Sequence, residues 1–281
     1  MASHQYNLLE HFLFPPTSLN LAKLKTACYQ KTILITGASF GIGATLTKLL
    51  AQTEAQLILV ARTADKLQEL QASLTQQKAS IQIIPTDLTQ TQQVEHLVQQ
   101  IKALPQGLDL VISNAGHSIY RPLQASLERF HDFQRTMNIN YFAPVQLLLP
   151  LIPLLAKKQG QIINISAINV LLLPAPHWAA YQASKAAFDQ WFRCAGPELA
   201  TSNIRCTSIY LPLVKTRMIA PTKAYDKMPA MQPQHVAKII AKSIYTKHRK
   251  FAPWWLFFGQ LGSLLFRGPW EFFTPYFLKK R

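Results

Sequence analysis

A buried strand that breaks at a glycine turn and resumes as a helix constrains the fold of this chain most strongly. Residues 32–36 read as the strand, the turn is Gly37-Ala38-Ser39-Phe40-Gly41-Ile42-Gly43, and helix formers follow to about residue 52. Glycines let the backbone come close to an anion, and the free N–H groups at the helix N-terminus point toward it. The Gly-x-x-x-Gly-x-Gly spacing between these elements therefore predicts a phosphate-binding turn.

Strands and helices alternate along the chain after this turn. Further strands are expected at 56–60, 81–85, 108–113, 161–166 and 204–211, with helices between them. Their apolar runs are nearly continuous, which is typical of strands buried on both faces. The pattern predicts an α/β fold in which a doubly wound parallel β-sheet carries helices on both faces, a Rossmann fold.

The length of 281 residues and the apolar content of 49% suit one large domain with a full core. We expect a catalytic domain at 31–250, an N-terminal leader at 1–30 and a C-terminal helical extension at 251–281. Cys28, Cys194 and Cys206 form neither a metal-ligand spacing nor an even disulfide set, so we expect no metal site and a reducing cytoplasm. The N-terminus lacks the pattern of a secretory signal.

The net charge of +16 predicts an anionic partner. Nucleic acid, an anionic lipid surface and a phosphate-bearing cofactor or substrate would each satisfy this charge. No platform of aromatic and basic residues and no reading helix is evident, so we rank nucleic acid last and expect none.

Arg62 stands at the end of the second predicted strand. In nicotinamide-binding folds an acidic residue at this strand end holds the ribose hydroxyls, whereas an arginine there can hold a 2′-phosphate. Arg62 therefore favours NADP over NAD. The alternative is an exposed arginine near the start of a helix, without a ligand.

Tyr181 and Lys185 lie four residues apart in a run of helix formers from about residue 179 to 199. Side chains at this spacing point from the same face of a helix. A fixed cation beside a phenol stabilises the phenolate and lowers its pKa toward the working range, which makes Tyr181 a candidate general acid. Taken alone, the pair could equally be two neighbours on a solvated helix face.

Several other motifs stand in register with this pair. The glycine turn with Thr36 before it, Asn114-Ala115-Gly116, Asn140, Tyr181-x-x-x-Lys185 and residues 212–216 resemble the short-chain dehydrogenase/reductase family, in order and in spacing. The resemblance covers about residues 31–245. Because independent motifs share one register, it favours the general-acid interpretation of Tyr181 over the solvated pair.

The resemblance implies a role for each matching residue. The pyrophosphate would be lined by Gly37, Ser39, Gly41 and Ile42, the adenine would lie near Asp87 and Leu88, the ribose side would be held by Asn114, and the carboxamide would meet Thr216. The expected cofactor-binding set is completed by Phe40, Ala115, Gly116, Pro212 and Val214. In the catalytic set, Asn140 would support a proton-relay water, while Lys185 would bind the nicotinamide ribose and lower the pKa of Tyr181.

The family's catalytic serine is the main departure. It normally follows the helix asparagine by about 27 residues, which is the position of Ala167, and Ser166 stands one residue early. Strand side chains alternate between faces, so Ser166 should point away from the site. The following loop is one residue longer than usual, and a bulge there could re-aim Ser166 into the catalytic set. Loss of the hydroxyl would cost on the order of 2 to 4 kcal/mol in the transition state.

A finer resemblance lies in residues 140–144, 211–222 and 225–229, which are similar to the bacterial long-chain fatty acyl-CoA reductase branch. Members of that branch reduce an acyl thioester to a fatty aldehyde with NADPH. The resemblance further implies that the loop after the sixth strand caps the substrate.

The C-terminal stretch combines aromatic and basic residues. Residues 253–258 and 261–266 are rich in Trp, Phe and Leu, and Arg267, Lys279, Lys280 and Arg281 follow them. The apolar run is too short to span a bilayer, but it suits a segment lying on an anionic membrane. A helix packed on the protein's own core or in a dimer interface is the alternative.

Two classes of function remain open. The first is an NADPH-dependent reductase of a lipid-like carbonyl or long-chain acyl-CoA, either free in the cytoplasm or peripheral on the inner membrane surface. The second is a protein that keeps the cofactor-binding fold but has weak or lost catalysis, because Ala167 replaces the serine. We also expect a homo-oligomer.

Overall fold

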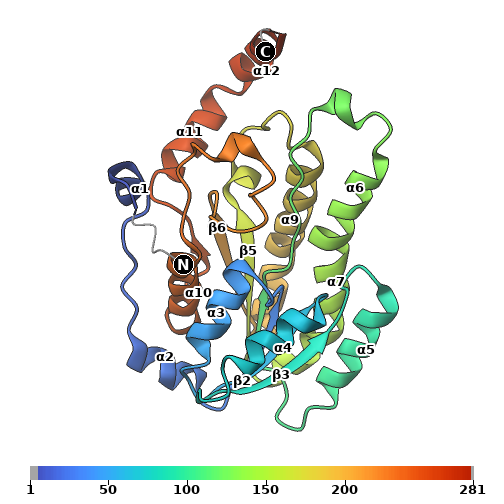
Figure 1. Cartoon of the computed structure of the whole chain (residues 1–281), viewed down its shortest axis with the longest axis vertical. Helices are drawn as coiled ribbons and strands as arrows, with labels where there is room; N and C mark the ends of the chain where they lie inside the picture. Colours follow the sequence, from blue (N-terminus) through green and yellow to red (C-terminus); the bar gives the residue numbers. More distant parts are fainter. Residues whose placement is uncertain (1–5, 280–281) are drawn as a thin grey trace.

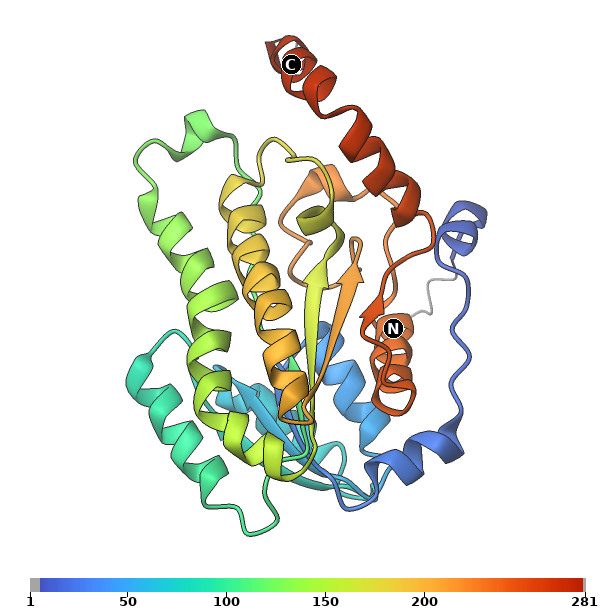
Figure 2. The same cartoon turned by 180° about the vertical axis from the view of Figure 1, so that it is seen from behind.

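A parallel sheet of seven strands runs through the centre of the molecule (Figures 1 and 2), in the order β3-β2-β1-β4-β5-β6-β7. The computed structural model describes residues 6–279, so Lys280 and Arg281 of the basic C-terminus lie outside it. The strands are β1 Thr32–Thr36, β2 Gln56–Ala61, β3 Ser80–Pro85, β4 Leu110–Ser113, β5 Gln161–Ala167, β6 Arg205–Leu211 and β7 Lys250–Phe251. The predicted doubly wound parallel sheet is confirmed.

The strand order reverses between β1 and β4. From β1 the chain proceeds outward through β2 and β3, and it then returns to the other side of β1 to build β4, β5 and β6. In open α/β sheets the crevice at such a switch point, outside the carboxyl ends of the strands, is where ligands bind. Gly37 follows β1 and Asn114 follows β4, so both motifs stand at this crevice.

Helices cover both faces of the sheet because the strands are apolar on both sides. On one face α2 (Leu21–Cys28), α3 (Gly41–Leu50) and α10 (Pro233–Thr246) pack on the core, and on the other α5 (Thr91–Lys102) and α9 (Ala179–Thr201) do so. The remaining α-helices are α1 Leu8–Leu13, α4 Ala64–Ala72, α6 Phe130–Met137, α7 Ala143–Leu148, α8 Ile152–Lys157, α11 Leu256–Leu265 and α12 Arg267–Lys279. Short turns are 3-10 helical at η1 Leu123–Ser126, η3 Leu149–Leu151, η4 Ile168–Leu171 and η5 Lys223–Tyr225, and π-helical at η2 Asn138–Phe142.

The helical run 130–157 is long and apolar enough to cross a membrane if length and composition are the only criteria, with 28 residues and a mean hydropathy of 1.6. Its side chains Leu147, Leu148, Leu151 and Leu155 are buried in the core beneath the sheet. We therefore interpret the run as a core helix of the domain.

Both chain ends contribute to the core beyond the expected limits of 31–250. Phe14 and Leu24 of the leader are buried in the same cluster as β1. At the other end Phe251 of β7 pairs with Ile209 of β6, and Leu256 is fully buried. The part of the extension that stands apart is α12, which has no buried side chain and projects away from the domain (Figures 1 and 2).

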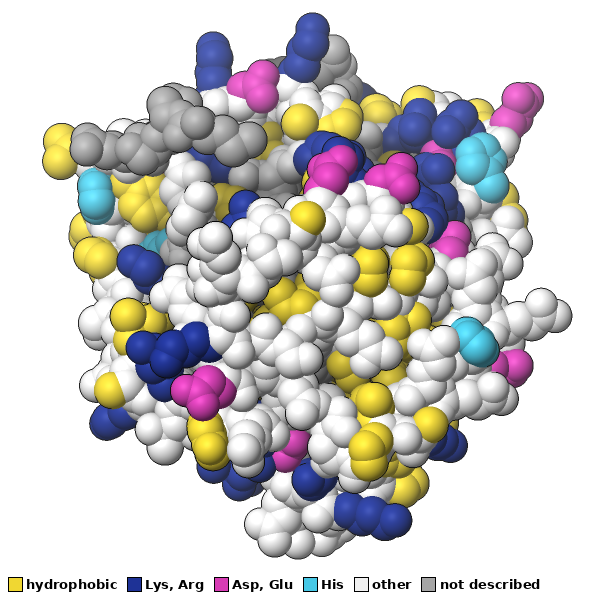
Figure 3. Space-filling view, turned by 60° about the horizontal axis from the view of Figure 1, so that its bottom comes forward, with side chains coloured by type: hydrophobic (Ala, Val, Ile, Leu, Met, Phe, Trp, Pro, Cys, Tyr) yellow, Lys and Arg dark blue, Asp and Glu magenta, His cyan; other side chains and the backbone are white. Residues whose placement is uncertain are grey.

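The positive charge is distributed. Lys and Arg side chains are spread over the face shown in Figure 3 and do not gather there into one patch. On this face the positive charge is therefore not confined to a single site.

Candidate active site

The glycine turn after β1 has the geometry of an anion cradle. Gly37 and Gly41 have φ angles of +65° and +53°, a region that residues with a side chain rarely adopt. A Cβ atom on Gly41 would lie 3.0 Å from Thr216 Cγ2. Phe40 caps α3 without a side-chain hydrogen bond, so the first N–H groups of the helix can receive an anion. The turn and Thr216 thus meet, while the contact of Thr216 with a carboxamide stays a prediction.

The Asn114-Ala115-Gly116 motif is fastened to this turn. Asn114 Nδ2 donates to the carbonyl oxygens of Thr36 and Gly37 at 3.0 and 3.2 Å. The backbone N–H groups of Asn114 and Ala115 both donate to Thr36 Oγ1 at 3.0 Å. These bonds hold the ends of β1 and β4 at a fixed spacing across the switch point.

Asn140 and Lys185 meet on the other side of Gly116. A Cβ atom on Gly116 would lie 3.0 Å from Asn140 Oδ1 and 3.3 Å from Lys185 Nζ, so only glycine leaves both side chains in place. Asn140 lies in the π-helical turn η2 and donates through Nδ2 to the His117 carbonyl (2.8 Å) and to Ser184 Oγ (2.9 Å). Lys185 Nζ donates to the Ile165 carbonyl at 3.1 Å.

Tyr181 and Lys185 both project from the first turns of α9, as expected. Burial lowers the pKa of Lys185 to about 8, against the attraction of Asp189. Burial also raises the pKa of Tyr181, and Tyr225 raises it further. The expectation that Lys185 lowers the pKa of Tyr181 is therefore wrong for this structure, because desolvation of the phenolate dominates. A phenol that keeps its proton can still donate it to an oxyanion.

The Ser166 side chain does not point toward the Tyr181–Lys185 pair. Its hydroxyl donates to Asp189 Oδ1 at 3.1 Å, and Asp189 lies eight residues beyond Tyr181, about 12 Å along the helix axis. No bulge re-aims it, since Ser166 pairs with Tyr210 and Ala167 with Leu211 in an unbroken register. The inclusion of Ser166 in the catalytic set is thus not supported by its position.

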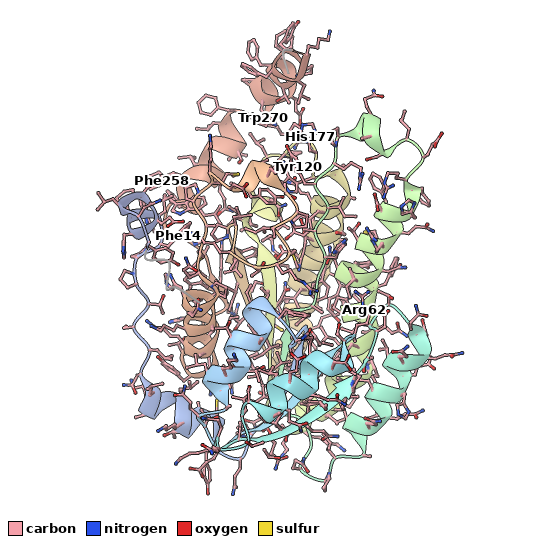
Figure 4. The ribbon with its side chains drawn as sticks, in the orientation of Figure 1. Phe14, Arg62, Tyr120, His177, Phe258 and Trp270 are labelled. Atoms are coloured by element: carbon pink, nitrogen blue, oxygen red, sulfur yellow. The ribbon has the colours of Figure 1, made fainter. Side chains whose placement is uncertain are left out.

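The expected adenine side of the site is more open. Arg62 is exposed at the end of β2, well apart from the residues at the top of the sheet (Figure 4). Burial lowers the pKa of His117, and the charges of Arg135 and Arg62 lower it further. Leu88 is buried, and Asp87 Oδ1 accepts hydrogen bonds from the backbone and hydroxyl of Thr89.

The remaining expected cofactor residues stand around the same crevice. Ser39 and Ile42 belong to the glycine turn and are partly buried. Pro212 follows β6, and Val214 forms a parallel bridge with Met231. This bridge closes the base of the 215–230 loop, which is expected to cap the substrate.

An aromatic cluster at the start of α9 was not anticipated from the sequence. Tyr120 contacts the rings of His177 and Trp178 at centroid distances of 5.2 and 4.6 Å, and Tyr120 and His177 lie together at the top of Figure 4. Trp178 Nε1 donates to the Tyr225 hydroxyl at 2.8 Å. Residues from three separate segments form this cluster, and no local pattern links them.

Glu10 was also missed. Its buried carboxylate pairs with Lys215 at 2.7 Å and accepts from the backbone N–H of Ala230 at 3.2 Å, so it joins the two ends of the 215–230 loop. Burial alone would raise the pKa of Glu10, but the bonds from Lys215, Ala230 and Asn7 outweigh it and hold the pKa low. The spacing of Asn7 and Glu10, a capping box, was the one local signal.

The sequence pattern and this geometry match a known family. A family model described as short chain dehydrogenase matches residues 31–227, which include the glycine turn, Asn140 and the Tyr181–Lys185 pair. The chain belongs to the short-chain dehydrogenase/reductase family. It is therefore an NAD(P)-dependent oxidoreductase of that type, as the motifs predicted.

Two relatives in the family have similar length and a named activity. The chain is 45% identical over 237 residues to a fatty acyl-CoA reductase of Acinetobacter baylyi, covering 84% of this chain and 79% of that protein. It is 40% identical over 224 residues to a fatty acyl-CoA reductase of Mycobacterium tuberculosis, covering 79% and 76%. The resemblance to the fatty acyl-CoA reductase branch is thus confirmed.

Solved structures share the fold. A short-chain dehydrogenase of Sphingobium yanoikuyae in complex with NADPH has a TM-score of 0.72 at 23% identity, covering 79% of this chain and 87% of that one. A short-chain type dehydrogenase/reductase of Mycobacterium marinum has a TM-score of 0.73 at 23% identity, covering 82% and 94%. At this identity the comparison bears on the fold alone.

Proposed function

We propose that this enzyme uses NADPH to reduce a long-chain acyl thioester, such as a fatty acyl-CoA, to a fatty aldehyde. The observation that carries the proposal is the 45% identity to a fatty acyl-CoA reductase across 84% of the chain. Asn140 and Lys185 meet at Gly116, and Tyr181 precedes Lys185 by four residues on α9, an arrangement suited to the proton transfer that this reaction needs.

The residues present fit a phosphorylated dinucleotide. The positive-φ glycines and the start of α3 suit the pyrophosphate, and Arg62 suits the 2′-phosphate of NADP. Asn114 and Lys185 would hold the ribose groups, and Thr216, close to Gly41, would meet the carboxamide. When bound, NADPH supplies the hydride that the carbonyl carbon accepts.

Tyr181 would act as the general acid. Its phenol donates to the carbonyl oxygen as that oxygen gains negative charge, and takes the proton back when the C–S bond breaks. The products are the aldehyde and a thiolate that gains a proton from water. Asn140 would support a water that resupplies the site, because its side chain is held by His117 and Ser184.

The test is NADPH oxidation with long-chain acyl-CoA and identification of the aldehyde by mass spectrometry. We expect stoichiometric aldehyde and free thiol. Binding of NADPH without oxidation on any acyl-CoA, followed by turnover on a different carbonyl compound, would contradict the proposed substrate.

A second candidate is a cofactor-binding protein with little or no catalysis. It is favoured by one observation, the bond of Ser166 to Asp189 together with the absence of a hydroxyl at Ala167. NADPH fluorescence titration followed by turnover assays with acyl-CoA and aldehyde separates the two. Tight binding without any oxidation would support this second candidate.

We also propose that the enzyme is cytoplasmic and docks peripherally on an anionic membrane through α11 and α12. Leu264, Phe272 and Phe277 are 77%, 63% and 70% exposed. The adjacent residues Phe272 and Phe273 point to different sides of α12, and both are exposed, so the helix is apolar around more than one face. A one-sided protein interface would leave part of this surface in water, whereas lipid would cover it.

The N-terminal helix α1 extends the same surface. It lies beside the base of α11 in both views (Figures 1 and 2) and exposes Leu8, Leu9 and Phe12. The ring of Phe12 contacts that of Trp254 at 5.1 Å, and Trp254 Nε1 donates to the Phe12 carbonyl. A long-chain substrate is scarce as free monomer in water, so docking here would give the enzyme access to it.

Sedimentation with phosphatidylglycerol vesicles tests this docking in the full-length protein. The double variant Phe272→Ser/Phe273→Ser should lose most of the binding, and added salt should weaken the binding of the wild type. The matched control Leu123→Ser/Leu127→Ser removes two side chains of similar exposure elsewhere and should bind normally. Equal loss in both variants, or loss of an oligomer in place of vesicle binding, would contradict the proposal.

A homo-oligomer is proposed as well. Phe130, Phe142 and Leu149 are each more than half exposed along the run α6–α8, which is more apolar surface than an isolated subunit usually leaves in water. Analytical ultracentrifugation in detergent-free buffer tests this, and a monomer at micromolar concentration would contradict it.

A further inference from the structure

With Tyr181 as the proton donor, reduction of the substrate carbonyl still needs a second hydrogen-bond donor to the carbonyl oxygen. The carbonyl oxygen gains negative charge, and active sites of this kind stabilise such an oxygen with a second hydrogen-bond donor. Ser166 is committed to Asp189, and Ala167 has no hydroxyl. If the proposed carbonyl reduction is correct, the second donor must come from another element.

Tyr225 is the phenol best placed to be that donor. It lies in the turn η5 within the loop that is expected to cap the substrate, and its side chain is buried with a relative exposure of 6%. Its hydroxyl accepts a hydrogen bond from Trp178 Nε1 at 2.8 Å. An indole N–H can only donate, so this bond occupies one lone pair of the phenol. Ser118 is the second hydrogen-bond partner of this hydroxyl, and a bond donated by Ser118 occupies the other lone pair and leaves the phenolic proton for a ligand.

The position of Trp178 places this hydroxyl at the start of α9, the helix that carries Tyr181. Trp178 caps the N-terminus of α9, three residues before Tyr181, and residues at that spacing are neighbours on a helix surface. Trp178 and Tyr225 also stack, with ring planes at 18° and centroids 6.0 Å apart. The stacking and the hydrogen bond together fix the direction from which the Tyr225 hydroxyl approaches the start of α9.

The electrostatics agree with this geometry. Tyr225 is one of the two causes that raise the pKa of Tyr181, so the two phenols are near enough to interact. Burial raises the pKa of Tyr225 itself, against hydrogen bonds from Trp178 and Ser118. Tyr225 is therefore protonated at neutral pH, as a hydrogen-bond donor must be.

We propose that the Tyr225 hydroxyl donates a hydrogen bond to the carbonyl oxygen of the substrate and takes over the role of the missing serine. Tyr181 transfers the proton, and Tyr225 stabilises the oxyanion without giving up its own. Because Tyr225 belongs to the cap loop, the oxyanion site is complete only when this loop lies over the substrate.

Tyr225→Phe removes the hydroxyl and keeps the ring that stacks on Trp178. We expect kcat on a long-chain acyl-CoA to fall by about 10² to 10³, with KM and NADPH affinity changed less than about threefold. Tyr210→Phe is the matched control, because it also removes one hydroxyl from a buried phenol, the one bonded to Asp189. It should leave kcat within about twofold of the wild type.

A family-like serine supplies the converse test. Ala167→Ser in the Tyr225→Phe background restores a hydroxyl where the family has one, and it should recover at least about tenfold of the lost kcat. The same Ala167→Ser change in the wild type should have a much smaller effect, since the oxyanion already has its donor. Non-additivity of this kind marks two groups that serve one function.

A binding measurement separates this inference from the proposed substrate. Decanamide has a carbonyl that is inert to hydride, and its affinity for the enzyme with NADPH can be measured by calorimetry without any turnover. An amide oxygen carries more negative charge than the oxygen of a ground-state thioester, so Tyr225→Phe should weaken decanamide binding at least about tenfold although KM for the thioester changes little, and Tyr210→Phe should not. A Tyr225→Phe variant with wild-type kcat and wild-type decanamide affinity, even if its melting temperature falls, would overturn the proposal.

Discussion

The cofactor side and the substrate side of the active site differ in what holds them. On the cofactor side Gly37 and Gly41 have backbone angles that favour glycine, a Cβ on Gly116 would crowd Asn140 and Lys185, and Asn114 holds two strand ends together. On the substrate side the serine position holds Ala167, and an aromatic cluster from distant segments lies at the start of α9, the helix that carries Tyr181. Where the backbone itself forms the binding site, few substitutions are tolerated. Where side chains form it, a side chain from another segment can take over a role that one residue has lost.

The largest expected effect lies at the junction of the two sides. Tyr181→Phe should lower turnover by about 10² to 10⁴, because it removes the proton donor, while NADPH affinity stays within about twofold. Steady-state kinetics and fluorescence titration measure the two quantities. Wild-type turnover in this variant would show that the acid has been misassigned.

Next in size is a change on the cofactor side alone. Arg62→Ala should lose roughly 1 to 3 kcal/mol of preference for NADPH over NADH, since a charge-assisted phosphate contact disappears. Arg249→Ala carries the same change in net charge at the start of β7, far from this strand end, and should keep the preference. Equal affinity of the wild type for the two cofactors would refute the role of Arg62.

A third prediction concerns the pH dependence of stability. The folded pKa of Lys185 is about 8, below its ordinary value of 10.5, so between these values the unfolded chain binds more protons. Protonated Lys185 therefore lowers the free energy of unfolding of the ligand-free protein, by the full amount below about pH 8. This loss of stability decreases as the pH rises toward 10.5. Lys185→Met should be more stable than the wild type at neutral pH, with a difference that shrinks over that window in urea titrations. If the free energies of unfolding of the two proteins changed with pH in parallel, the shifted pKa would be contradicted.

The smallest effect is expected from the residue that resembles the missing catalytic group. Ser166→Ala should change kcat by less than about twofold and lower the free energy of unfolding by about 1 kcal/mol, because it loses a buried hydrogen bond to Asp189. Kinetics and urea denaturation measure both. A loss of kcat above about tenfold would place Ser166 back in the catalytic set.

Much of the fold could be predicted because its strands are long apolar runs and its turns need glycine. The two-residue strand β7 could not, since Lys250 and Phe251 carry no periodicity of their own. Phe14 and Leu24 are two of many Phe and Leu residues in the leader, and only the folded structure shows which of them pack against β1.

In the candidate site, too, local features could be predicted from the sequence and long-range contacts could not. Motifs next to the strand ends follow from local spacing, so Gly37 after β1 and Asn114 after β4 lie together at the switch point of the predicted sheet. The direction of Ser166 depends on the register of β5 against β6, and the place of Tyr225 depends on a loop closing over α9. Such contacts link residues far apart in the chain and leave no trace in a short motif.

The way the two chain ends meet has a consequence for synthesis on the ribosome. Tyr6 is hydrogen-bonded to His235 across 229 positions, and Trp254 reaches Phe12 across 242. Glu10 can secure the ends of the cap loop only after Ala230 has emerged, so the apolar helix α1 waits unpartnered while most of the domain is made. Nascent chains should thus bind chaperones through their first residues, and the substrate loop should be the last part of the enzyme to become native.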